Sequence, residues 1–254
     1  MAHGVGSWSW SQRTGGALST ADQRALMAQA VQVQWRRLAK RILPVWGKGT
    51  ASITDASFII PDTQVALRAA SACAQVSPLW LQHHCSRAYV WATLLAKHAD
   101  LRYDAELLYV AAMLHDLGLT ATYARSDATA HCFGVVGARA TNALAVAAQW
   151  TEARQAALFD AISLHLNISV AINQGVEAHL LHAGTSYDVI GTNHRKISPA
   201  ARLHIIENYP RLNFKQEITT SLREQSVLHP NSRAAFLERR FAFSQRIANA
   251  PFHE

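Results

Sequence analysis

A continuous apolar run, LLYVAAML at residues 107–114, is the feature that most constrains how this chain folds. The run is far shorter than the roughly 20 residues that cross a bilayer. Asp104 as a cap and Gly118 as a stop therefore predict a buried helix. Its last turn carries His115 and Asp116. Two ionisable side chains at a buried helix end are costly, so we expect a metal, a partner charge or surface exposure to compensate them.

Helix patterns continue along most of the chain, and alternating strand patterns are scarce. Thr20 and Gln23 have the spacing of a capping box, which predicts a helix over residues 19–43 that Pro44 stops. One short stretch, SVAIN at residues 169–173, has strand character. Further helix patterns cover residues 60–75, 77–99, 104–118, 134–150, 151–166, 177–191 and 197–209. The fold class predicted is all-α, a compact bundle of about eight to ten helices.

Length and composition indicate one globular domain. The chain has 254 residues, of which 50% are hydrophobic, enough for one substantial core. We assign residues 19–254 to this domain and residues 1–18, which lack the apolar core of a secretory signal, to a flexible N-terminal arm. The three cysteines have no C-x-x-C spacing, so we expect reduced thiols and a cytoplasmic protein.

The net charge of +7 raises the question of an anionic partner. The basic residues gather in WRRLAKRI at 35–42 and RAAFLERRFAFSQR at 233–246, mixed with apolar residues at helical spacing. This pattern favours solvated helix faces over a nucleic-acid or membrane surface. We therefore expect a small-molecule substrate, with no nucleic acid and no membrane as partners.

A metal at His115 and Asp116 needs ligands from other helices. Adjacent side chains on a helix diverge by about 100°, so the helix end must also adjust. The candidates are His84 and Asp188, and two imidazoles with two carboxylates suit Zn²⁺, Mn²⁺ or Fe²⁺. The i,i+3 pair His179 and His182 also has ligand-like spacing, but we favour a solvated helix face for it.

Six ordered motifs resemble a known family. His84, then MLHDLG around His115 and Asp116, then a distant Asp188 resemble the HD-domain metallohydrolases. The order and spacing over residues 60–215 resemble the cyanamide hydratase-like branch of that superfamily. The motifs are HCSRAYVWA, LLYVAAMLHDLGLT, FGVVGARA, AISLH, LLHAGTSYDVIG and YPRLNFK.

This resemblance implies an HD-type helical domain that holds one divalent metal, with Zn²⁺ favoured over Fe²⁺ or Mn²⁺. The implied ligands are His84, His115, Asp116 and Asp188. Members with two metals carry a further histidine where this chain has Phe133, which favours a single ion.

The implied reaction adds water to a small nitrile, cyanamide giving urea, with the metal activating the water. Asp116 would accept the proton of the water, and His165 would deliver one to the nitrile nitrogen. The resemblance also makes a homodimer plausible. Substrate contacts are expected from Arg87, Thr120, Phe133 and Thr185.

Three departures from the branch concern the substrate. They are His83 before the first ligand, Gly134 after Phe133, and Asn167 near His165, and they put cyanamide itself in question. A phosphohydrolase with the same ligands, in which Arg87 holds the phosphate, is the alternative. An oxidative enzyme with two irons and a degenerate binding module are less favoured.

Overall fold

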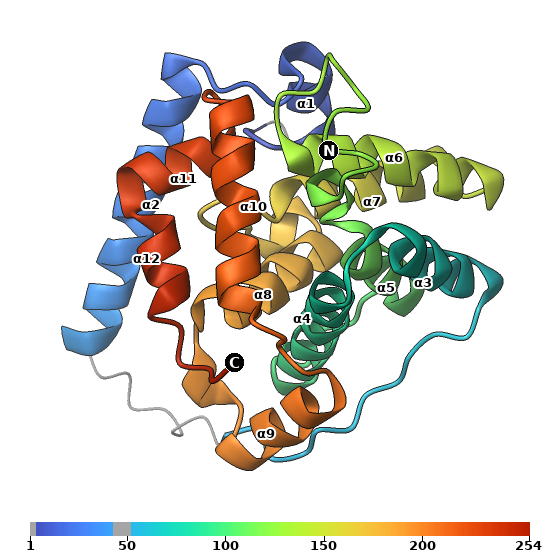
Figure 1. Cartoon of the computed structure of the whole chain (residues 1–254). Coiled ribbons are helices and arrows are strands. Elements are labelled where there is room, and N and C mark those ends of the chain that lie inside the picture. Colours follow the sequence, from blue (N-terminus) through green and yellow to red (C-terminus); the bar gives the residue numbers. More distant parts are fainter. Residues whose placement is uncertain (1–3, 43–51) are drawn as a thin grey trace.

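The computed structural model describes residues 4–42 and 52–254, and within them the chain is all-α, as predicted (Figure 1). These residues form twelve α-helices, somewhat more than the eight to ten expected. The helices are α1 (Trp8–Thr14), α2 (Thr20–Ile42), α3 (Gln64–Val76), α4 (Leu79–His98), α5 (Ala105–Leu114), α6 (Phe133–Ala147), α7 (Glu152–Leu164), α8 (Val176–Ile190), α9 (Pro199–Asn208), α10 (Phe214–Leu228), α11 (Arg233–Phe241) and α12 (Phe243–Ala248). Three short 3₁₀ turns are η1 (Leu117–Leu119), η2 (Ile172–Gln174) and η3 (His194–Lys196).

Side-chain caps explain where several helices begin. Asp104 accepts the Leu107 N–H at 2.9 Å at the start of α5, as the sequence predicts. Helix α2 begins at Thr20, and its capping box joins Ser19 and Asp22 instead of the predicted Thr20 and Gln23. The predicted end of α2 near Leu43 and Pro44 lies outside the described residues.

The predicted strand over residues 169–173 does not form. Its last residues enter the 3₁₀ turn η2, and the one β-bridge among the described residues joins Ile53 to Ile197. A single bridge leaves no sheet in this part of the chain, so the packing is helix on helix.

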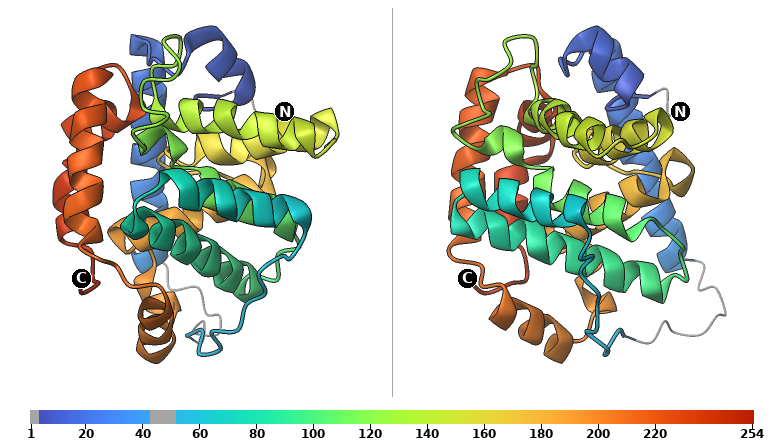
Figure 2. Two further views of the ribbon diagram at one scale, coloured as in Figure 1. Left: turned by 45° about the vertical axis from the view of Figure 1, so that its right-hand side comes forward. Right: turned by 90° about the vertical axis from the view of Figure 1, so that its right-hand side faces the viewer.

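The centre of the fold is the pair α4 and α8, with α5 and α7 beside it. Helices α3 to α5 lie on one side, whereas α10 to α12 cover another and α2 runs along the outside (Figures 1 and 2). Gly184 allows α8 to approach α4 closely, because a Cβ there would collide with the Ala88 carbonyl oxygen. This close approach brings His84 of α4 near Asp188 of α8.

Residues 4–18, part of the flexible arm predicted for residues 1–18, contain the helix α1, which packs on the rest of the fold. Ser7 caps α1, and Trp10 is only 4% exposed. The Trp8 N–H donates to Asp160 Oδ1 at 2.6 Å, which fixes α1 on α7. Two tryptophans in a polar stretch give the short helix enough apolar surface to dock. Residues 1–3 of the predicted arm lie outside the described residues.

Cys73, Cys85 and Cys132 are free and buried. In the part of the chain that the structure describes, every helix is too short or too polar to cross a membrane.

Candidate metal centre

The turn at the end of α5 brings His115 and Asp116 to one point. Helix α5 ends at Leu114, His115 is still helical (φ −63°, ψ −30°), and Asp116 leaves the helix (φ −104°, ψ 14°) before η1. This is the adjustment that two adjacent ligands require. Gly118 allows it, because a Cβ there would collide with the Phe133 carbonyl oxygen at the start of α6.

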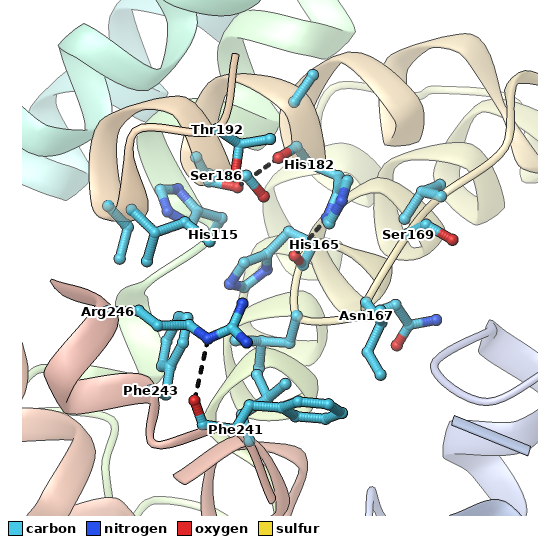
Figure 3. A pocket seen from close by; sticks show the side chains of 18 of the residues that line it. His115, His165, Asn167, Ser169, His182, Ser186, Thr192, Phe241, Phe243 and Arg246 are labelled. Atoms are coloured by element: carbon cyan, nitrogen blue, oxygen red, sulfur yellow. Dashed lines mark hydrogen bonds between the residues drawn. The ribbon is translucent and has the colours of Figure 1, made fainter. Parts of the chain in front are cut away.

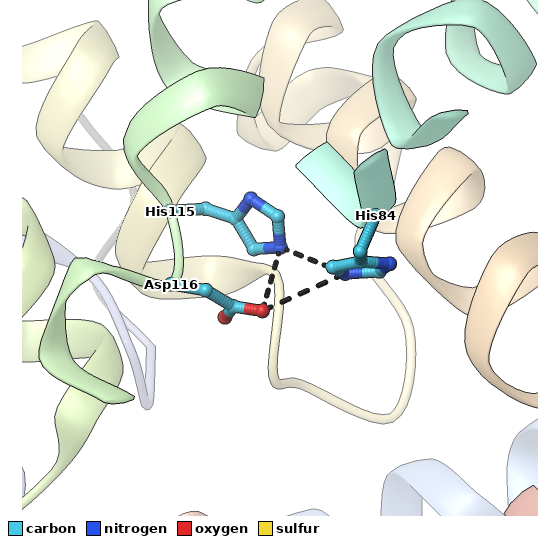
Figure 4. A group of neighbouring side chains, drawn as sticks. All are labelled: His84, His115 and Asp116. Atoms are coloured by element: carbon cyan, nitrogen blue, oxygen red, sulfur yellow. Dashed lines mark hydrogen bonds and ion pairs between the residues drawn. The ribbon is translucent and has the colours of Figure 1, made fainter. Parts of the chain in front are cut away.

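Three ligand atoms converge at this turn (Figure 4). His84 Nε2 from α4 lies 3.2 Å from His115 Nε2 and 3.5 Å from Asp116 Oδ2. His115 Nε2 and Asp116 Oδ2 are 3.2 Å apart. All three residues are buried. The group can hold a metal ion through two imidazole nitrogens and a carboxylate oxygen.

A hydrogen bond at Nδ1 orients each of the two imidazoles. His115 Nδ1 donates to the Ala112 carbonyl oxygen at 2.8 Å, and His84 Nδ1 donates to Asp188 Oδ2 at 2.8 Å. The proton of each neutral ring then sits on Nδ1, so both Nε2 lone pairs face the Asp116 carboxylate. Two lone pairs and an anion repel one another unless a cation or a proton lies among them. The donor set therefore fits a divalent metal.

Burial and neighbouring charges shift the pKa values of the three ligand residues in different directions. Burial opposes ionisation of Asp116, but His115 outweighs it and holds the pKa of Asp116 below its usual range. Burial also opposes a charged His115, and the Asp116 carboxylate outweighs it and raises the pKa of His115. Burial lowers the pKa of His84. A proton and a metal ion would therefore compete for His115 Nε2 beside the Asp116 carboxylate.

Asp188 lies behind His84 and not beside the three ligand atoms, which differs from the fourth-ligand position predicted. Its Oδ1 accepts from Arg87 Nε at 2.9 Å, Trp91 Nε1 at 2.8 Å and Arg211 Nη1 at 3.3 Å. Its Oδ2 accepts from Arg87 Nη2 at 3.0 Å as well as from His84. Burial opposes the Asp188 charge, but Arg87 and Arg211 outweigh it and hold the pKa of Asp188 well below its usual range. Both carboxylate oxygens are therefore occupied, and one of their hydrogen bonds orients His84.

His165 stands next to the group. Its Nδ1 donates to the Ile162 carbonyl oxygen at 2.5 Å, which leaves the Nε2 lone pair 3.6 Å from Asp116 Oδ1. Its ring meets that of His115 edge-on, with centroids 4.9 Å apart. Burial lowers the pKa of His165 to about 3, so the ring is neutral at physiological pH. His165 can accept or pass a proton at Asp116.

A cavity of about 340 Å³ opens onto these residues (Figure 3). Its walls come from α2, α8, α10, α11, α12 and residues 165–170, which follow α7, and they are mainly apolar. Its polar and ionisable lining includes His84, His115, Asp116, His165, Asn167, Ser169, His179, His182, Thr185, Ser186, Thr192, Asn193 and Arg246.

The four predicted substrate contacts divide into two pairs. Phe133 and Thr185 line the cavity. Arg87 and Thr120 do not, and their donors are used elsewhere. Arg87 Nη1 donates to the Tyr209 and Pro210 carbonyl oxygens, and Thr120 Oγ1 donates to the carbonyl oxygen of Leu117, the first residue of η1.

The structure adds two cavity residues that the sequence patterns had placed on solvated helix faces. His182 is half-buried, and its Nδ1 donates to the His165 carbonyl oxygen at 3.0 Å. Arg246 reaches the cavity from α12. The i,i+3 spacing of His179 and His182 was the signal for the first, whereas no local pattern marks Arg246.

The three residues at which the sequence motifs depart from the expected pattern, Asn167, Gly134 and His83, lie in different places. Asn167 lines the cavity and accepts a hydrogen bond from Arg233 at 3.1 Å. Gly134 lies behind His165, where an added Cβ would come within 3.6 Å of the ring and 3.1 Å of Leu166. His83 lies outside the cavity lining, with its Nδ1 bound to the Pro210 carbonyl oxygen.

No protein-family model matches the chain, and no protein of curated function matches its sequence significantly.

Proposed function

We propose that this protein is a metal-dependent hydratase of the HD-domain type, which adds water to a nitrile-type substrate. The observation that carries the proposal is the convergence of His84 Nε2, His115 Nε2 and Asp116 Oδ2 on one point, with His165 beside them. The resemblance of the six motifs to the cyanamide hydratase-like branch supports the choice of reaction.

The buried donor set supports one divalent metal, with Zn²⁺ favoured because nitrogen and carboxylate ligands suit it. When bound, such an ion lowers the pKa of a water from 15.7 toward about 7 and so supplies hydroxide at neutral pH. His84 and His115 would hold it through Nε2, and Asp116 through Oδ2.

The protons are handled by Asp116 and His165. Asp116 Oδ1, the oxygen turned away from the two ligand histidines, accepts a proton from the attacking water. His165 Nε2, 3.6 Å from Oδ1, relays it to the nitrile nitrogen as the water oxygen bonds to carbon and a C–N π bond breaks. The first product is an imidic acid, which tautomerises to the amide. With cyanamide that amide is urea.

The cavity suggests a substrate larger than cyanamide. A nitrile of three heavy atoms takes about the space of two water molecules, roughly 60 Å³. The 340 Å³ available is in the range of pockets that enclose whole metabolites. The apolar walls would pack against a substrate body while the nitrile lies at the metal.

A phosphohydrolase remains the second candidate because one cation, Arg246, lines the cavity. Its support is weaker than the sequence indicates. Arg87, the predicted phosphate ligand, is buried and bound to Asp188, Tyr209 and Pro210.

A product assay separates the two reactions. The metal-loaded protein is incubated with cyanamide, a set of larger nitriles and a set of nucleotides and phosphomonoesters, and amide and inorganic phosphate are measured. The proposal predicts amide from at least one nitrile, with loss of activity in Asp116→Asn. Phosphate release without amide formation would overturn it.

A further inference from the structure

The charged side chains of the cavity are unevenly distributed. Of the lining residues that the structure describes, only Asp116 carries a carboxylate and only Arg246 carries a permanent positive charge. Asp116 belongs to the metal centre, where its charge is matched by His115. Arg246 is the one permanent cation among these described lining residues, and no carboxylate of the lining matches it.

Arg246 is held in place but not neutralised. Its Nε donates to the Phe241 carbonyl oxygen at 3.0 Å, and its guanidinium carbon lies 5.8 Å from the centre of the Phe241 ring. No ion pair joins it to a carboxylate of the described residues. Figure 3 shows its guanidinium pointing into the pocket, on the side of His165. The fixed Nε orients two Nη groups toward the cavity.

Arg246 is exposed, and the buried arginines near the site behave differently. Arg87 and Arg211 bind Asp188, and Arg233 donates to Ser163 and Asn167. These guanidinium groups are structural. Arg246 is the one that faces the space where a ligand would lie.

A guanidinium with free Nη donors is a fork that matches the two oxygens of a carboxylate or phosphate. An uncharged nitrile such as cyanamide would leave it unused. Phe241 and Phe243, which line the cavity next to it, offer an aromatic wall to the body of a ligand.

We propose that Arg246 binds an anionic group of the substrate, so that the pocket takes an organic oxyanion with an apolar or aromatic body. The identity of the reacting group at His84, His115 and Asp116 rests on the proposed function. The anion contact does not, because it can be measured without turnover.

Calorimetric titration with matched probes tests the proposal. The metal-loaded protein is titrated with 4-cyanobenzoate, its neutral analogue 4-cyanobenzamide, and phenyl phosphate. We expect at least one of the two oxyanions, the carboxylate or the phosphate, to bind roughly tenfold to a hundredfold more tightly than the amide, as charge-assisted hydrogen bonds predict. The preference should shrink as salt is raised. The carboxylate and phosphate arms show which oxyanion the site prefers.

Arg246→Gln should abolish this preference and leave amide binding unchanged. Arg240→Gln is the matched control, since Arg240 is exposed on α11, outside the cavity lining, and its loss changes the net charge equally. Metal content and melting temperature verify that Arg246→Gln is folded. Equal binding of oxyanions and amide, no binding of any probe, or the same loss in Arg240→Gln would overturn the proposal. Oxyanion binding without hydration of any nitrile would instead contradict the proposed function alone.

Discussion

His84 Nδ1 lies 2.8 Å from Asp188 Oδ2, and this hydrogen bond turns His84 Nε2 toward His115 and Asp116. The carboxylate is itself fixed by Arg87, Trp91 and Arg211. Such a carboxylate–histidine pair orients a metal ligand and sets its tautomer. The structure therefore places Asp188 as a residue that positions His84.

Asp188→Asn should destabilise the fold strongly. The substitution removes the charge that faces buried Arg87 and Arg211, and an unpaired buried charge costs about 3–5 kcal/mol. Urea denaturation of the metal-free protein measures this free energy of unfolding. Asp116→Asn, which leaves no arginine unpaired, should cost less. Full stability of Asp188→Asn together with complete loss of metal would show instead that Asp188 is a ligand.

The sequence predicts the helices well but not the partners of the charged residues. Capping residues such as Asp104 are local signals, and the structure confirms that cap. The predicted stop at Gly118 differs, because α5 already ends at Leu114 and Gly118 lies in η1. The role of Asp188 depends on Arg211, which lies far along the chain and reaches it only through tertiary packing. No periodicity reports such a contact.

The candidate site likewise combines residues that local motifs identify with residues that only tertiary packing brings together. His84, His115 and Asp116 were found because their motifs are local and ordered. The mixed polarity of its helix predicts a solvated face for Arg246, which is exposed, and only the packing of α12 shows that it also lines the cavity. The helix α1 was missed because its apolar surface is two tryptophans in a polar stretch, although Ser7 and Gly15 are recognisable caps.

His165→Ala should lower turnover by about 10²- to 10⁴-fold, the usual contribution of a general acid or base. Metal content should stay near that of the wild type, because His165 is not among the three converging ligand atoms. Steady-state kinetics and elemental analysis of the same samples measure both. His83→Ala is the control and should keep full turnover, since His83 lies outside the cavity. A metal-free His165→Ala would assign His165 as a ligand.

Metal affinity should fall as the pH falls. Burial opposes a charged His115, but the Asp116 carboxylate outweighs it and raises the pKa of His115 above its ordinary value of 6.5, and a protonated imidazole cannot bind a metal. Affinity should be full above that raised pKa and decline about tenfold for each pH unit below it. Competition with a chromophoric chelator across a pH series measures this. A pH-independent affinity would mean that the metal does not compete with a proton for His115.

Asp160→Asn should stabilise the protein at neutral pH. Burial raises the pKa of Asp160 from 3.8 to about 6, so the native state favours the protonated form. Its contribution is fully present below pH 3.8 and is lost as the pH rises through about 6. Asn keeps an oxygen for the Trp8 N–H without the charge, and we expect a gain of roughly 1–3 kcal/mol at neutral pH. Thermal unfolding from acidic to neutral pH checks this, and an equal effect at every pH would contradict it.

The most direct test of the metal centre is the metal-to-protein ratio, measured by elemental analysis of the purified wild-type chain and of His84→Gln, His115→Gln and Asp116→Asn. Reconstitution with Zn²⁺, followed by removal of loosely bound ions, makes the samples comparable. The account predicts about one divalent ion per wild-type chain and a strong loss in all three variants, each still folded. No tightly bound ion in the reconstituted wild type, or an unchanged ratio in the variants, would contradict it.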